Sequence, residues 1–145
     1  MCLLKDTISC KLFFKYLGNG VTESPQNIKF IGGVNMTNQL VQLNIRFKAK
    51  PGKKEEFRKE LFSLIEEMSS EKAFISAIVS DNLDQPDELL IYETWKGTRD
   101  SWLDEEFTKP YRKNYEVRVD DLIVERSVSW LQPIREWGSH ITNAY

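Results

Sequence analysis

Hydrophobic and polar residues alternate along residues 40–48, where the sequence reads LVQLNIRFK. The apolar members of this alternation are Val41, Leu43, Ile45 and Phe47. A period of two places these side chains on one face of a strand, so the segment predicts a half-buried β-strand. The turn-forming residues Pro51 and Gly52 follow and predict where it stops.

The next segment, KKEEFRKELFSLIEEMSS, changes to a helical period. Its apolar side chains recur every three to four residues, at Phe57, Leu61, Leu64, Ile65 and Met68. This spacing predicts an amphipathic helix with one face toward a core. Two more strands are predicted at Ala73–Ser80 and in LLIYETW, and the polar turn between them contains Pro86. The two strands therefore form a predicted hairpin.

A second helical region follows the hairpin. Its regularly spaced large side chains are Trp102, Leu103, Phe107, Tyr111 and Tyr115. Pro110 divides the region, because a proline inside a helix loses a hydrogen bond and clashes with the preceding turn. The acidic run from Asp104 to Glu106 predicts a solvated turn. The segment DLIVERSVSWLQPI supplies a fourth strand, which ends before Pro133.

The predicted order of elements is β-α-β-β-α-β. This order is typical of an α+β fold, the ferredoxin-like sandwich, in which a four-stranded antiparallel sheet carries both helices on one face. Two helices leave the other face uncovered. The apolar residues that we expect there are Phe74, Ile78, Leu90, Tyr92, Ile123 and Val128 or its neighbours. We therefore expect a homodimer in which two sheets pack face to face.

The first 35 residues show no sustained period and are interrupted by glycines and a proline. We interpret residues 1–35 as an N-terminal extension that is loosely ordered, or that precedes the true start of translation at Met36. The alternative is a docking arm around KLFFKYL. Residues 36–135 form the predicted domain, and residues 136–145 form a C-terminal tail.

Composition and charge narrow the classes of function. The 145-residue chain has a formal net charge of −2, so its charge does not indicate nucleic acid or an anionic membrane as a partner. No apolar run approaches the roughly 20 residues needed to cross a bilayer. The two cysteines, Cys2 and Cys10, do not indicate a disulfide framework, and we expect a cytoplasmic protein. His140 is the only histidine, so a metal site with two histidine ligands is excluded.

Two motifs resemble those of a known family. The PG that opens the first helix and the YETW that closes the third strand, set in this order of elements, resemble the antibiotic biosynthesis monooxygenase family over about residues 40–132. The resemblance implies a dimeric α/β barrel built from ferredoxin-like domains, and a small oxygenase of the quinol monooxygenase type. Several members oxidise quinols or polycyclic phenols with O₂ and need no metal or flavin, so the resemblance implies no cofactor.

The resemblance and the local sequence together indicate a candidate site. Trp95 matches the family's tryptophan at the end of the third strand, and Asn44 lies one residue out of register with a functional asparagine of haem-degrading relatives. Glu106 and Tyr111 stand where many members have histidines, which argues against haem ligation by histidine. Arg112 adds a permanent cation within PYRKNY, where it could donate to a substrate oxygen.

We therefore predict a site for a quinol-like or polyphenolic small molecule. In this hypothesis Trp95 stacks on the flat substrate, and Arg112 or Asn44 stabilises its anion. The predicted substrate-binding residues are Tyr92, Phe107, Tyr111 and Tyr115. The alternatives are that Trp95 is a core aromatic, Asn44 an exposed strand residue and Tyr92 an interface residue. The domain would then be a non-catalytic dimeric barrel that binds a small ligand or acts in stress response.

Overall fold

The computed structural model describes residues 39–138. The elements along the chain are β1 (Leu40–Ala49), α2 (Lys54–Met68), β2 (Phe74–Asp81), β3 (Glu88–Lys96), α3 (Arg99–Glu105), α4 (Pro110–Val119) and β4 (Ile123–Leu131). This order confirms the predicted β-α-β-β-α-β arrangement, with the second helical region present as two helices separated just before Pro110. The predicted N-terminal extension, Met36 and His140 lie outside the described residues.

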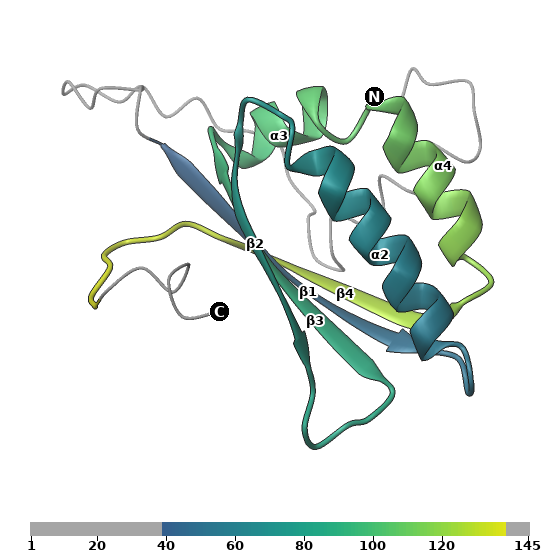
Figure 1. Cartoon of the computed structure of the whole chain (residues 1–145). Coiled ribbons are helices and arrows are strands. Elements are labelled where there is room, and N and C mark those ends of the chain that lie inside the picture. Colours follow the sequence, from purple (N-terminus) through teal and green to yellow (C-terminus); the bar gives the residue numbers. More distant parts are fainter. Residues whose placement is uncertain (1–38, 139–145) are drawn as a thin grey trace, which may run out of the picture.

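The four strands form one antiparallel sheet in the order β2-β3-β1-β4. Helices α2 and α4 lie across one face of this sheet, and α3 lies at one end of it (Figure 1). The predicted α+β, ferredoxin-like fold is therefore confirmed. The face that carries the helices is called the helix face below, and the opposite face is called the open face.

The core lies between the helix face and α2 and α4. The predicted apolar positions of β1 all point into it, and each is at most 5% exposed. From α2, Phe57 is fully buried, and its ring centroid lies 4.9 Å from that of Phe47. Full burial of such a side chain stabilises a fold by about 1.5–3 kcal/mol relative to leaving it in water. The apolar side chains predicted for β1 and for α2 thus pack together in one hydrophobic cluster.

Two register shifts change which side chains reach the open face. In β2 the pairing shifts between Phe74 and Ser76, so Phe74 lies opposite Trp95 on the helix face. A second shift, where β1 pairs with β4, places Ile123 opposite Ala49. The expectation that Phe74, Ile123 and Val128 lie on the open face is wrong, since all three pack against the core. A strict period of two cannot anticipate the extra residue of a β-bulge.

The open face is consequently of mixed character. Ile78 and Tyr92 lie side by side on it, as predicted, and Leu90 is their neighbour along β3. Polar side chains of β1 share this face, and the Tyr92 hydroxyl donates a hydrogen bond to Gln42 Oε1 at 2.7 Å. The open face is therefore less apolar than the sequence pattern predicted.

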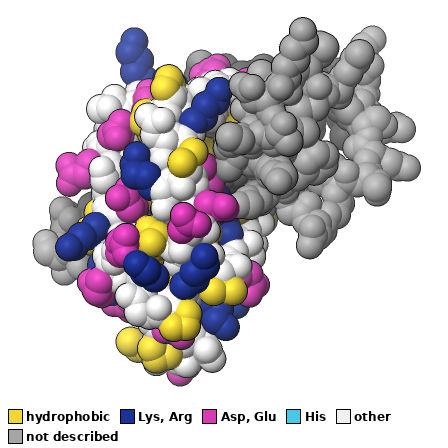
Figure 2. Space-filling model, turned by 90° about the vertical axis from the view of Figure 1, so that its right-hand side faces the viewer, with side chains coloured by type: hydrophobic (Ala, Val, Ile, Leu, Met, Phe, Trp, Pro, Cys, Tyr) yellow, Lys and Arg dark blue, Asp and Glu magenta, His cyan; other side chains and the backbone are white. Residues whose placement is uncertain are grey.

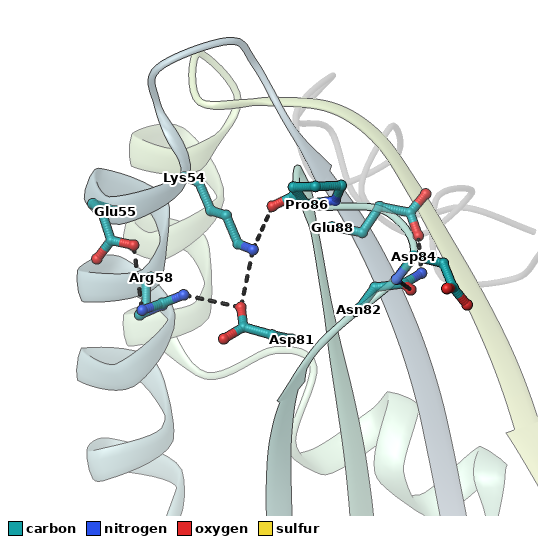
Figure 3. Close-up of polar contacts among 8 residues, drawn as sticks. All are labelled: Lys54, Glu55, Arg58, Asp81, Asn82, Asp84, Pro86 and Glu88. Carbon is teal, nitrogen blue, oxygen red and sulfur yellow. Dashed lines mark hydrogen bonds and ion pairs between the residues drawn. The ribbon is translucent and has the colours of Figure 1, made fainter.

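A polar network fixes the hairpin of β2 and β3 against the start of α2. Figure 3 shows Lys54 and Arg58 of α2 pointing toward Asp81 at the end of β2. The Asp81 carboxylate lies 2.9 Å from Lys54 Nζ and 2.9 Å from Arg58 Nη2, and Lys54 also donates to the carbonyl of Pro86. The hydrogen bond from Lys54 lowers the pKa of Asp81. Each exposed pair stabilises by about 0–1 kcal/mol, so the network mainly sets the position of the hairpin.

The surface carries both signs of charge. On the side drawn in Figure 2, acidic and basic side chains are interspersed over the described part of the chain, with single apolar side chains between them. This face presents no broad field of one sign, which agrees with the small net charge of −2. Within residues 39–138, no helix is long and apolar enough to cross a membrane.

Candidate functional site

The end of β3 and the start of α3 bring two tryptophans together. Trp95 is fully buried on the helix face, with Phe74 and Trp102 packed edge-on against it at centroid distances of 5.2 and 6.1 Å. Gly97 lies between the two tryptophans and adopts φ +109°, a backbone conformation that residues other than glycine rarely adopt. Thr98 then caps α3, because its hydroxyl accepts the Ser101 N–H at 3.1 Å. This turn directs Trp102 back toward Trp95.

Arg112 enters the same region from the first turn of α4. Pro110 is suited to the first position of this helix, where its missing N–H costs nothing. Arg112 is only 4% exposed, and its guanidinium carbon lies 4.6 Å from the ring centroid of Trp102 and 5.6 Å from that of Trp95. Cation–π contacts to both rings therefore hold the guanidinium in place.

Glu93 is a buried acid beside these groups. It lies two residues before Trp95, so both side chains point to the helix face, and Trp95 Nε1 donates to Glu93 Oε2 at 2.8 Å. Burial raises the pKa of Glu93, and the charge of Arg112 opposes that shift. The prediction missed Glu93, although its parity with Ile91 and Trp95 placed a carboxyl group on the apolar face of a buried strand.

Glu106 is a second buried acid, contrary to the expectation of a solvated turn. Asp104 and Glu105 are exposed, but Glu106 is only 5% exposed. It directly follows the last residue of α3, and its N–H donates to the Trp102 carbonyl at 2.9 Å. Burial raises the pKa of Glu106, and the charge of Glu71 adds to the effect. Within residues 39–138 its Oε2 atom has no hydrogen-bond partner.

Tyr111 lies next to this acid and the guanidinium. Its ring centroid is 5.8 Å from the guanidinium carbon of Arg112, and the side chain is partly buried. Burial raises the pKa of Tyr111 to about 12, so the phenol stays protonated at neutral pH. At the edge of the site, Lys109 Nζ forms an ion pair with Glu71 at 3.0 Å.

The structure brings together five of the seven predicted site residues and separates the other two. The five that lie on the helix side of the sheet are Trp95, Phe107, Tyr111, Arg112 and Tyr115. Asn44 and Tyr92 are paired neighbours on the open face. The sheet therefore lies between Asn44 and Arg112, and one small molecule cannot touch both within a single subunit. We use the name Arg112 cluster for Glu93, Trp95, Trp102, Glu106, Tyr111 and Arg112.

Two surface recesses lie away from this cluster. One, of about 340 Å³, lies between α2 and β2 and is lined by Phe62, Ile65, Glu66, Ser69, Ala77 and Val79. The other, of about 210 Å³, lies where β1 begins and β4 ends, beside Arg99 and Trp130. Neither recess is lined by a member of the Arg112 cluster.

Similarity to solved structures shows the fold class of the chain, a small ferredoxin-like domain. Rv0793 from Mycobacterium tuberculosis is 26% identical with a TM-score of 0.60, and the match covers 68% of this chain and 99% of that chain. SO0527 from Shewanella oneidensis is 23% identical with a TM-score of 0.60, covering 66% and 92%. SnoaB, a cofactor-independent oxygenase from Streptomyces nogalater, is 12% identical with a TM-score of 0.61, covering 70% and 99%.

The sequence also matches a family model over part of its length. Residues 41–106 match the family model of antibiotic biosynthesis monooxygenases. This match to a monooxygenase-type family confirms the resemblance seen in the motifs of the chain. The match spans β1 to the end of α3 and includes Trp95 and Glu93, whereas Arg112 lies beyond it. A comparison with curated proteins found no match.

Proposed function

We propose that the protein is a cofactor-independent monooxygenase that oxidises a quinol-like or polyphenolic small molecule with O₂. The family of residues 41–106 supports this proposal, and SnoaB, which shares the fold, is a cofactor-independent oxygenase. The observation that carries it is the buried guanidinium of Arg112, which lies among aromatic rings and two buried carboxyl groups.

The chemistry needs little from the protein beyond an environment for an anion. For an anthrone-type substrate, the CH₂ carbon becomes a carbonyl, one atom of O₂ enters the product and the other leaves as water. A phenolate or enolate is electron-rich enough to give an electron to O₂ directly. The protein must therefore favour the anion and exclude water, and Arg112 would stabilise the negative charge in a buried site.

The remaining cluster residues have matching proposed roles. Glu93 and Glu106 are buried carboxyl groups whose pKa values are raised by burial, which suits a proton acceptor for a phenol. Phe107 and Tyr111 are half-buried and would border the substrate, while the fully buried Tyr115 would close the site from behind. Trp95 is fully buried and in contact with the guanidinium of Arg112, so we propose that it holds this group in place and does not itself stack on the substrate.

We also propose that the protein is a homodimer that pairs through the open face. In this arrangement Asn44 and Tyr92 belong to the interface and not to the Arg112 site. The apolar side chains available there are Ile78, Leu90, Tyr92 and Leu131. The cytoplasmic location expected from the cysteine content stays a prediction.

Oxygen consumption by the metal-stripped protein tests the enzymatic proposal. A panel of quinols and anthrones should include at least one substrate that is oxidised faster than in buffer. Arg112→Ala should then slow turnover by about 10²-fold or more, since it removes a donor to developing charge, and Trp95→Ala should weaken binding. Arg118→Ala, on the exposed side of the same helix, is the matched control.

The alternative is a non-catalytic barrel that binds a small ligand. The complete burial of Trp95 favours this alternative, because a fully covered ring is typical of a core residue. Absence of oxygen consumption with every member of the panel would support it and would refute the enzymatic proposal.

A further inference from the structure

Within residues 39–138, one complete edge of the Arg112 guanidinium makes no hydrogen bond. Its Nε and Nη2 atoms are both buried, and neither has a hydrogen-bond partner within the described part of the chain. These two nitrogens carry parallel N–H bonds on the same edge of the planar group. It is one of the two edges through which arginine can bind two oxygen atoms of one partner at once.

The orientation of this edge is set before any ligand arrives. Trp102 and Trp95 contact the guanidinium at 4.6 and 5.6 Å, so rotation of its plane is restricted. Burying two donors without acceptors is unfavourable, and such groups in native proteins call for a ligand or ordered water. A pre-oriented pair of donors binds without losing much further side-chain freedom.

The surrounding charges indicate what kind of oxygen pair fits. Glu93 and Glu106 are both buried near Arg112, and neither accepts a hydrogen bond from its Nε–Nη2 edge. A ligand that arrives as a carboxylate would be repelled by any of these acids that is ionised. A neutral diphenol avoids this repulsion on entry and can lose a proton afterwards.

We propose that the Nε–Nη2 edge of Arg112 binds the two neighbouring oxygens of an ortho-diphenol. The substrate O–H bond breaks as one carboxylate of the cluster takes the proton, and the electron pair stays on the phenolate oxygen beside the guanidinium. This inference deepens the proposed oxidation and rests on it for turnover, but the recognition step can be measured alone. Because the edge is covered, entry must displace a side chain, and the half-buried Phe107 and Tyr111 can move at least cost.

Anaerobic calorimetry of the full chain separates recognition from oxidation. The probes are the position isomers 1,2-, 1,3- and 1,4-dihydroxynaphthalene, with 2-naphthoate as the carboxylate probe. The 1,2 isomer should bind about tenfold more tightly than the 1,3 and 1,4 isomers, because only it satisfies both donors, and one hydrogen bond to a charged group accounts for such a factor. It should also bind more tightly than naphthoate.

A substitution that keeps the charge tests the geometry. Arg112→Lys retains a cation but not the two-donor edge, so the isomers should bind within about twofold of one another. Arg118→Lys, at an exposed position of α4, should keep the wild-type preference. Thermal melting shows whether Arg112→Lys is folded, and if it is not, the isomer series on the wild-type protein decides alone.

Several results would overturn the inference. They are equal binding of the three isomers, no binding of any isomer, tighter binding of naphthoate, or a folded Arg112→Lys protein that keeps the preference. A clear preference for the 1,2 isomer, with no oxygen consumption on any diphenol, would support the inference about recognition and refute the proposed oxidation.

Discussion

Replacing Glu116 by glutamine should strongly destabilise the domain. Glu116 lies on α4 and Arg126 on β4, and their side chains form an ion pair at 2.7 Å in which both are about 95% buried. The Arg126 guanidinium also lies 5.1 Å from the ring centroid of Phe47, deep in the core. The substitution keeps the shape of the side chain but leaves the arginine charge without its carboxylate partner.

The size of the effect follows from this burial. Breaking a buried ion pair by removing one partner typically costs 3–5 kcal/mol, which is a large part of the about 5–15 kcal/mol that stabilises a domain. For a domain of about 100 residues, 3 kcal/mol corresponds to a fall in melting temperature of about 12 °C or more. The exposed pair of Arg46 and Glu125, at 3.1 Å, should contribute less than about 1 kcal/mol.

Urea denaturation followed by tryptophan fluorescence measures both pairs under the same conditions. Glu116→Gln should lower the free energy of unfolding by about 3 kcal/mol or more, and the control Glu125→Gln by less than about 1 kcal/mol. A double replacement of Glu116 and Arg126 by leucine and methionine should recover much of the loss, since both charges of the buried pair are then removed together. If Glu116→Gln costs no more than Glu125→Gln, burial of the pair does not determine its energy and the reasoning fails.

Three further predictions concern the site and the assembly. Burial raises the pKa of Glu93 in the folded state above its unfolded value of about 4.3, so the folded protein binds more protons and stability should fall as the pH rises above that value. Glu93→Gln should flatten this dependence in melting curves taken across pH, and parallel curves for both proteins would contradict it. Gly97→Ala should cost about 1–3 kcal/mol in urea melts, because φ is +109° and the new Cβ would lie 2.5 Å from Ser101 Oγ; an unchanged midpoint would contradict the strain. Sedimentation at micromolar concentration should show a dimer, whose interface should bury at least about 1,000 Å². A monomer at this concentration would refute the proposed pairing through the open face.

The helices and strands could be predicted because short local patterns of residues determine them. Alternation in β1 and the helical period of α2 each follow from side chains that must leave water, and Pro110 marks the start of α4 because its ring fits only the first turn. These signals are local in the sequence. The order of elements then leaves few possible folds.

The bulges and the polar cluster were harder to predict. The extra residue at Ile75 moves every later side chain of β2 to the opposite face of the sheet. Isoleucine is common in regular strands, so the residue type does not indicate a bulge. The burial of Glu106 depends on how α3 and α4 pack, which is a tertiary property. Glu93 differs from these cases, since its parity within β3 already placed it inward and a charged residue at such a position signals a site. The pairing of Arg112 with two tryptophans joins segments from different elements and could not be inferred from spacing.

The two register shifts also bear on how the protein behaves when it is concentrated. Both occur in the edge strands of the sheet, near Ile75 in β2 and Val124 in β4, where apolar side chains are 43% and 61% exposed. An edge strand carries unpaired N–H and C=O groups that can recruit the edge of another chain, and a bulge bends and twists the strand out of that geometry. Deleting Ile75 would straighten β2, and the consequence should be aggregation from an edge that the natural sequence keeps irregular.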